Sequence, residues 1–192
     1  TTGRESNAEK DGDNISWWRR NAIRLDSEVI RDSILSLAGT LDLTMGGPPV
    51  ASDKQEDSRR RSIYFFHSNN ERNLFLTTFD GALVSECYLR NQSVVPQQAL
   101  AMTNSRLVLD ASKPIAERIS KAINQNESDI DDAEFIRSAF MLLLGYTPSN
   151  AELGACQETI EKWRELPSVS SQDARSYLVW SLLNHNDFIT LR

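Results

Sequence analysis

Apolar residues recur at three- and four-residue steps along much of this chain, which is the spacing of an amphipathic helix. In residues 26–38 the apolar stripe consists of Val29, Ile30, Ile34, Leu37 and Ala38. Gly39 follows directly, and glycine commonly ends a helix because it adopts a left-handed conformation at little cost. The pattern therefore predicts a helix over 26–38 that buries one face.

Two prolines bear on the next helical segments. Pro96 suits the first position of a helix, because its missing N–H would have no partner within the helix, and this short helix is expected to reach Asn104. Pro114 is expected to restart or kink a second helix. The apolar positions of that second helix are Ile115, Ile119 and Ile123.

Capping signals mark three further helices towards the end of the chain. The run "DAEFIRSAFMLLLG" has helical spacing and closes on Gly145. Ser149 and Glu152 form a capping box, in which the hydroxyl and the carboxylate each satisfy a backbone amide at the start of a helix. Ser170 and Asp173 give a weaker signal of the same kind for the last helix.

The segment between the first helix and Pro96 has no clear helical period. "TMGGPPVASDKQEDSRRR" is rich in glycine, proline and charge and predicts a loop, whereas "SIYFF" is β-branched and aromatic enough for a short strand. "LFLTTFD" is too short to separate a helical turn from an extended segment. The chain is expected to be mainly α. It would be an irregular helical domain of about five to six helices with long loops and at most a short β segment near Ser62–Phe66.

Composition limits the class of protein. Residues 1–16 are polar and predict a flexible arm, and Trp17 and Trp18 would mark the start of a single domain over 17–192. The net charge is −6, with 21 Lys and Arg against 27 Asp and Glu, which argues against binding to nucleic acids or anionic membranes. No apolar run reaches the ~18–20 residues of a membrane-spanning helix, and the first residues lack the pattern of a secretion signal.

The cysteines and histidines suggest no cofactor or metal in this chain. Cys87 and Cys156 would either form one disulfide or remain as two buried thiols. The C-x-x-C-H pattern of covalent haem attachment is absent. His67 and His185 share no local motif, so no zinc site is expected.

Asp80, Glu86 and Arg90 lie together in "FDGALVSECYLRN". They are candidates for an acid/base pair with an anion-binding arginine. The structural alternative is that Arg90 is buried and pairs with Asp80 or Glu86, which would anchor this loop to the helical half. We favour the structural alternative, because the sequence shows no set of nucleophile, base and orienting residue.

An enzyme hypothesis remains open beside the structural one. Its site would contain Asp80 and Arg90, with His67 and Cys87 added, and its substrate would be a polymer such as a polysaccharide. His67 is also consistent with an ordinary hydrogen-bonded histidine, and Cys87 would act as a nucleophile only beside a histidine. A third hypothesis is a calcium site built from Asp80, Glu86 and backbone carbonyls, although the sequence contains no EF-hand pattern.

Several segments, in this order, are similar to one family: "IRLDSEVIRDSILSLAGTLDLTMGGPPV", "RRRSIYFF", "TFD", Cys87, "RNQSVVPQQALAMTN" and "WSLLNHNDFI". The chain resembles the C-terminal, planctomycete-specific domain of unknown function found in large cytochrome c-associated proteins. The resemblance runs from Trp17 to Ile189, and the stretch from Arg90 to Asn104 is its most specific part.

The resemblance implies a setting without implying a reaction. Such proteins are exported, so a periplasmic or extracellular location is expected, and the chain would be the C-terminal part of a larger protein. A haem-binding cytochrome c-like domain and a second planctomycete-specific domain would precede it, so haem c is expected only upstream. The upstream domains are then the expected partners of a structural or interaction domain. Such a domain would have an exposed apolar patch and no deep polar pocket.

Overall fold

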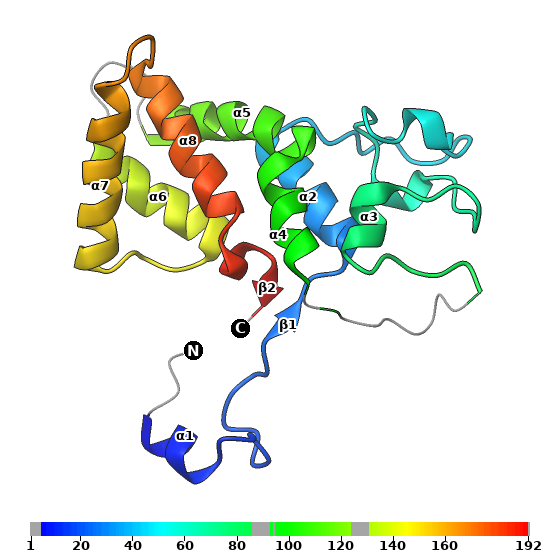
Figure 1. The fold of residues 1–192 in the computed structure, drawn as a ribbon, viewed down its shortest axis with the longest axis horizontal. Helices are drawn as coiled ribbons and strands as arrows, with labels where there is room; N and C mark the ends of the chain where they lie inside the picture. Colours follow the sequence, from blue (N-terminus) through cyan, green and yellow to red (C-terminus); the bar gives the residue numbers. More distant parts are fainter. Residues whose placement is uncertain (1–4, 86–92, 94, 124–130, 192) are drawn as a thin grey trace.

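The computed structural model describes residues 5–85, 93, 95–123 and 131–191 of the 192-residue chain (Figure 1). Eight α-helices lie in these ranges: α1 (Glu5–Lys10), α2 (Ser27–Ala38), α3 (Leu74–Thr78), α4 (Pro96–Asn104), α5 (Arg106–Ile123), α6 (Asp132–Leu144), α7 (Asn150–Arg164) and α8 (Ser171–Leu183). Shorter elements complete the described chain: the strands β1 (Ile23–Arg24) and β2 (Thr190–Leu191), and the 3-10 helices η1 (Ser52–Lys54), η2 (Ser62–Tyr64) and η4 (Asn186–Phe188). The expectation of a mainly α domain is confirmed.

Helix α5 is the centre of the helical body and packs against α2, α4, α6 and α8. Helix α7 packs outside α6 and α8, and α3 packs on α2 and α4 (Figure 1). The core formed by this arrangement is apolar, and several of its isoleucines have no exposed surface. They are Ile30 and Ile34 of α2, Ile115 of α5, Ile136 of α6 and Ile160 of α7. Burying each such side chain stabilises the fold by about 1.5–3 kcal/mol.

The predicted helix ends are confirmed. Gly39 and Gly145 have φ values of 72° and 78° and cap α2 and α6 in the left-handed conformation. Pro96 lies in the first turn of α4. Both capping boxes are present, Ser149 with Glu152 and Ser170 with Asp173.

The prediction that a helix restarts at Pro114 is wrong. Helix α5 begins at Arg106 and runs through Pro114 to Ile123. The proline removes one backbone donor from the helix interior. The apolar face is continuous across it, however, because Val108, Ala111 and Ile115 are all buried on the core side. This burial outweighs the local cost of the proline.

The segment near Ser62–Phe66 is not the expected strand. Ser62–Tyr64 forms the 3-10 helix η2, and Phe65 makes a single isolated bridge to Val50. A contact with α2 favours the turn over a strand. The Asp32 carboxylate accepts hydrogen bonds from the Ser62 backbone N–H and hydroxyl. The described sheet lies elsewhere: β1 and β2 pair antiparallel, with Ile23 opposite Leu191.

A polar network ties the last three helices together. Asp132 is the first residue of α6, and its carboxylate accepts two hydrogen bonds from the Arg164 guanidinium of α7, at 2.6 and 2.8 Å. Arg175 of α8, whose side chain is 7% exposed, donates to Asp132 Oδ1 at 3.0 Å. Two guanidiniums therefore hold one carboxylate at the point where α6, α7 and α8 meet.

The N-terminal residues project from the helical body. Helix α1 and the turn that follows it lie apart from the other helices in Figure 1, with β1 as the link. Trp17 is 85% exposed and does not pack against the helical body. The hydrophobic side chains that pack against the core begin at Leu25. The division into a polar arm over 1–16 and a domain over 17–192 stays a prediction.

Candidate functional site

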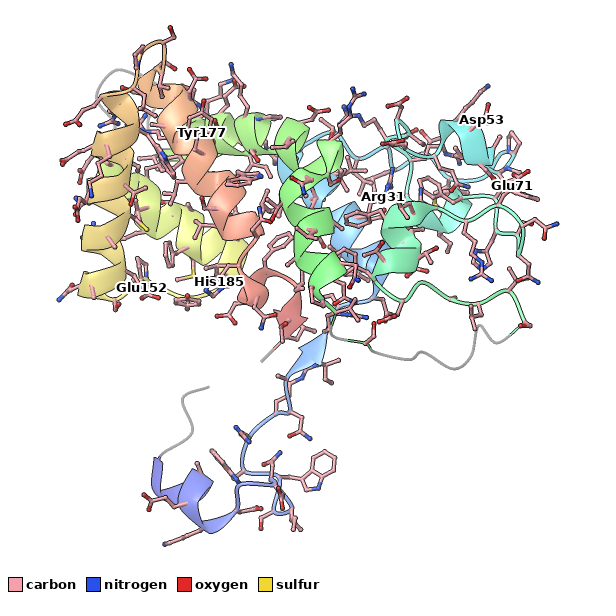
Figure 2. The ribbon with its side chains drawn as sticks, in the orientation of Figure 1. Arg31, Asp53, Glu71, Glu152, Tyr177 and His185 are labelled. Carbon is pink, nitrogen blue, oxygen red and sulfur yellow. The ribbon has the colours of Figure 1, made fainter. Side chains whose placement is uncertain are left out.

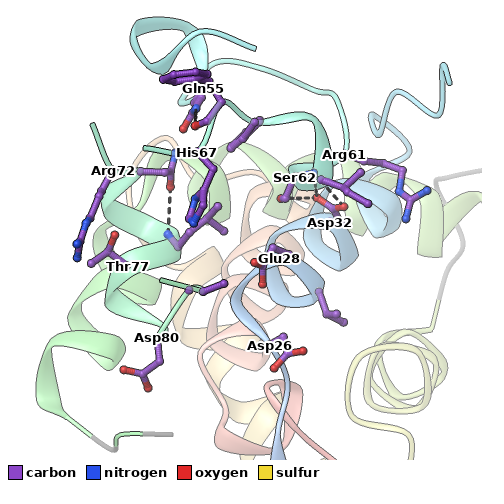
Figure 3. A pocket seen from close by; sticks show the side chains of 18 of the residues that line it. Asp26, Glu28, Asp32, Gln55, Arg61, Ser62, His67, Arg72, Thr77 and Asp80 are labelled. Atoms are coloured by element: carbon purple, nitrogen blue, oxygen red, sulfur yellow. Dashed lines mark hydrogen bonds between the residues drawn. The ribbon is translucent and has the colours of Figure 1, made fainter. Parts of the chain in front are cut away.

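A hollow of about 810 Å³ opens between α2, the η2 segment and α3 (Figure 3). Its lining includes two of the candidate catalytic residues, Asp80 and His67. The other two candidates, Arg90 and Cys87, lie outside the residues that the structure describes, as does Glu86. The hollow was not expected from the sequence, which favoured a domain without a deep polar pocket.

Asp80 is held in place by Arg24 and Ser93. Arg24 Nη2 donates to Asp80 Oδ2 at 2.6 Å, and the two side chains are 11% and 23% exposed. The Ser93 backbone N–H and hydroxyl both donate to the same carboxylate, at 2.7 and 2.9 Å. A carboxylate with three donors around it is bound as a structural anion.

Electrostatics point to the same conclusion. Burial raises the pKa of the Asp80 carboxyl, but hydrogen bonds from the Ser93 amide and the Arg24 guanidinium outweigh burial and hold that pKa below its ordinary value. A general acid at neutral pH needs the opposite shift, and a general base needs a pKa closer to neutrality. Asp80 is therefore suited to remain ionised and to hold the loop.

Arg24 makes an ion pair of the kind that the sequence suggested for Arg90, which lies outside the described residues. Besides the Asp80 carboxylate, the Arg24 guanidinium donates to the backbone carbonyls of Ser93 and Phe79, at 2.6 and 3.2 Å. Gln98 adds a second connection, because its buried side chain donates to the carbonyls of Thr78 and Ser93, both at 3.1 Å. The Gln98 side chain therefore lies inside the junction between α3 and α4.

Arg31 of α2, labelled in Figure 2, holds residues next to the lining of the hollow. The Arg31 side chain is 4% exposed, and its guanidinium donates to the carbonyls of Ser58 and Arg60 and to the Ser62 hydroxyl. The same guanidinium lies 4.5 Å from the centre of the Phe65 ring. Arg31 therefore fastens the long loop before η2 to α2.

His67 does not join Asp80 in a catalytic arrangement. Figure 3 shows the two side chains at separate places around the hollow. Within the described part of the chain, His67 is exposed and has no hydrogen bond or ion pair. The enzyme hypothesis expected Asp80, His67 and Arg90 to converge, and the two that are described do not.

Several apolar side chains in the hollow are left open to solvent, alongside polar and charged ones. Val29 is 45% exposed, although the sequence placed it on the buried face of α2. Ile63, Phe66 and Leu83 are 72%, 46% and 39% exposed and line the same hollow. Carboxylates and guanidiniums lie among them: Asp26, Glu28, Glu71, Arg61 and Arg72.

The described residues offer few other chemical centres. No group of three or more histidine, cysteine, aspartate or glutamate side chains among them is placed to hold a metal ion. Cys156 is half-buried, and burial raises the pKa of its thiol, which lowers its reactivity. None of the helices in the described ranges is both long enough and apolar enough to cross a membrane.

The chain matches the PSD1 family, described as a protein of unknown function (DUF1553), over residues 1–160. It belongs to that family. This confirms the resemblance to a family of domains of unknown function. Comparisons with curated proteins and with solved structures gave no match. PSD1 membership assigns no reaction to the hollow, so its role must be argued from its own geometry.

Proposed function

We propose that this chain is a non-catalytic interaction module that binds a polypeptide segment of its parent protein in the hollow between α2, η2 and α3. One observation carries the proposal. Asp80 and Asp32 already bind arginines and backbone amides, whereas Val29, Ile63 and Phe66 in the same hollow remain exposed. Exposed apolar side chains inside a concave surface are typical of a site where another chain is buried.

The family resemblance supplies the expected source of the segment. Proteins with this domain would carry a haem-binding cytochrome c-like domain and a second planctomycete-specific domain upstream, in an exported protein. We propose those upstream domains as the partners of the module, in the periplasm or outside the cell. Any haem c would belong to them, since this chain has no C-x-x-C-H pattern.

The second candidate function is cleavage of a polymer such as a polysaccharide. Its support is the size of the hollow, which falls within the range of about 300–1,000 Å³ found for ligand pockets, and the presence of Asp80 and His67 in its lining. The lowered pKa of Asp80 and its separation from His67 favour the interaction module.

The test uses the domain together with the upstream part of its parent protein, produced as a separate chain. Binding is measured by titration calorimetry for the wild type and for Phe66→Asp, which places a charge on the exposed apolar lining. Leu100→Asp is the control, because Leu100 is a 60% exposed apolar residue on α4 that does not line the hollow. We expect Phe66→Asp to weaken binding at least tenfold and the control to leave it unchanged.

Two results would contradict the proposal. One is equal binding by the wild type and Phe66→Asp. The other is cleavage of a polymer by the wild type that is lost in Asp80→Asn while the melting temperature stays the same, since that outcome identifies Asp80 as a catalytic residue.

A further inference from the structure

The N-terminal turn, residues 11–21, is held together by its own side chains. The Asp11 carboxylate accepts hydrogen bonds from the backbone N–H groups of Ile15 and Ser16, at 2.8 and 2.7 Å. The Trp18 indole N–H donates to the Asp11 carbonyl at 2.8 Å. Asn14 is 5% exposed and donates to the Arg19 carbonyl and to the Asn21 side chain, at 2.7 and 2.9 Å. These bonds define a fixed loop rather than an extended tail.

This turn presents its large apolar side chains to solvent. Ile15 is 78% exposed and Trp17 is 85% exposed. Trp17 also has a φ of 55°, in the left-handed region that a bulky residue rarely adopts and that costs on the order of 1–3 kcal/mol. An exposed tryptophan on a strained, fixed loop is suited to bind another protein surface, since tryptophan is prominent among the residues that dominate binding.

The turn cannot readily reach the hollow of its own chain. The hydrogen bond from Asn14 to Asn21 fixes the turn up to two residues before β1. Pairing of Ile23 with Leu191 then directs β1 away from the body (Figure 1). Only Ala22 lies between these two restraints. A return to the same chain's hollow would have to break one of them.

The chemistry of the turn complements the hollow. Residues 15–20 read "ISWWRR", with large apolar side chains followed by two arginines. The hollow offers exposed Val29, Ile63 and Phe66 for the apolar part. Apart from Asp32 and Asp80, which bind Arg31 and Arg24, its lining includes the exposed carboxylates Asp26 and Glu71. Exposed Asp26 and Glu71 suit the arginines at positions 19 and 20.

We infer that Ile15 and Trp17 of one copy of this chain dock in the hollow of a second copy. The inference rests on the proposed function in one respect, that the hollow binds a polypeptide, and it names the segment that the chain itself carries. Each copy has both parts, and in the inferred dimer the exchange is reciprocal, so that both hollows are filled and the contact closes with two-fold symmetry. A contact made by one short turn on each side is small, so we expect the weak, reversible class of interface below about 1,200 Å².

The experiment is light scattering or sedimentation of the full 192-residue chain over a wide range of concentrations. Trp17→Asn removes the anchor while keeping a residue that tolerates the left-handed conformation. Met45→Asn is its control, because Met45 is also 85% exposed and does not line the hollow. Phe66→Asp places a charge on the exposed apolar lining of the hollow, with Leu100→Asp as its control. All four variants change exposed side chains, so their circular dichroism melts should match that of the wild type.

We expect the wild type and both controls to form a concentration-dependent dimer and Trp17→Asn and Phe66→Asp each to be monomeric. Mixing the two monomeric variants is the decisive step. Trp17→Asn keeps an intact hollow and Phe66→Asp keeps an intact anchor, so the mixture should form a heterodimer through one contact.

Three outcomes would overturn the inference: a wild type that stays monomeric at every concentration, a dimer that persists in Trp17→Asn, or a mixture with no heterodimer. The proposed function is judged separately. If Phe66→Asp loses binding to the upstream part of the parent protein while Trp17→Asn keeps it and the wild type is monomeric, the hollow is still a docking surface but its occupant is not the N-terminal turn.

Discussion

Asp80→Asn separates the structural reading of the hollow from the catalytic one. The substitution keeps the size of the side chain and removes its charge. It is also compatible with the backbone, because Asp80 has a φ of 56° and asparagine, like aspartate, tolerates the left-handed region. In the variant an amide NH₂ replaces one acceptor oxygen, and the Arg24 guanidinium and the Ser93 donors face a neutral amide in place of a carboxylate.

The magnitude follows from the burial of this ion pair. An exposed pair is worth at most about 1 kcal/mol, and breaking a fully buried pair costs roughly 3–5 kcal/mol. The Arg24 and Asp80 side chains are 11% and 23% exposed, which lies between these limits. We therefore expect a loss of about 2–3 kcal/mol in the free energy of unfolding, from the charged hydrogen bonds and the uncompensated Arg24 guanidinium. For a chain of this length, that loss lowers the melting temperature by roughly 5–10 °C.

Thermal melts and urea titrations of the wild type and Asp80→Asn measure this loss directly. Asp57→Asn is the control, because it removes the same charge from an exposed loop position. An Asp80→Asn melting temperature within about 1 °C of the wild type would refute the structural reasoning, because a bound structural anion cannot be neutralised at so small a cost. Asp80 would then be a residue that serves a ligand.

Three further predictions concern other parts of the fold. Gly81→Ala should lower the free energy of unfolding, measured by urea titration, by about 1–3 kcal/mol, because an added Cβ would lie 2.8 Å from the Leu76 carbonyl oxygen. A urea midpoint equal to that of the wild type would show that α3 shifts freely. Arg31→Lys should lower the free energy of unfolding by about 2–4 kcal/mol and speed proteolysis of residues 42–61, because lysine lacks the planar fork that reaches three acceptors. Digestion at the wild-type rate would contradict this role of Arg31. Burial raises the pKa of the Asp132 carboxyl, but two guanidiniums outweigh burial and lower that pKa below the unfolded value of about 3.9. The stability that Asp132 contributes is thus present above about pH 4 and lost as the pH falls through its folded pKa. Below pH 4 the free energy of unfolding of the wild type should therefore fall more than that of Asp132→Asn. The same pH dependence of unfolding in both proteins would contradict this role of Asp132.

Helix positions were predictable because their signals are local. Gly39, Gly145 and the capping boxes at Ser149 and Ser170 act within one helical turn, so a few neighbouring residues contain the whole cause. Pro114 misled the prediction since its local cost is real but smaller than the burial of a face that continues on both sides of it. A local penalty is visible in sequence, and the packing that outweighs it is not.

The candidate site depended on contacts between distant segments. Arg24 and Asp80 are 56 residues apart, and Asp32 caps Ser62 from 30 residues away. The pairing of Arg24 with Asp80 was not predicted from the sequence, and the predicted role of Arg90 stays a prediction, because Arg90 lies outside the described residues. An arginine in a two-residue strand gives no periodic signal, so only the folded arrangement identifies it. The hollow and its exposed Val29 have the same origin, because they arise where three separate elements meet.

The pairing of β1 with β2 has a mechanical consequence. Ile23 and Leu191 form the outermost pair of this antiparallel ladder, so the chain enters and leaves the helical body at the same end of the ladder. Tension applied between the two ends of the chain would load that pair first and Arg24 with Thr190 next, because hydrogen bonds perpendicular to the strands then break one after another rather than together. Once both pairs of the ladder have separated, the load would pass directly to α2 and to the segment that follows α8. In a protein whose ends are held by other domains, this short ladder would be the first part to yield.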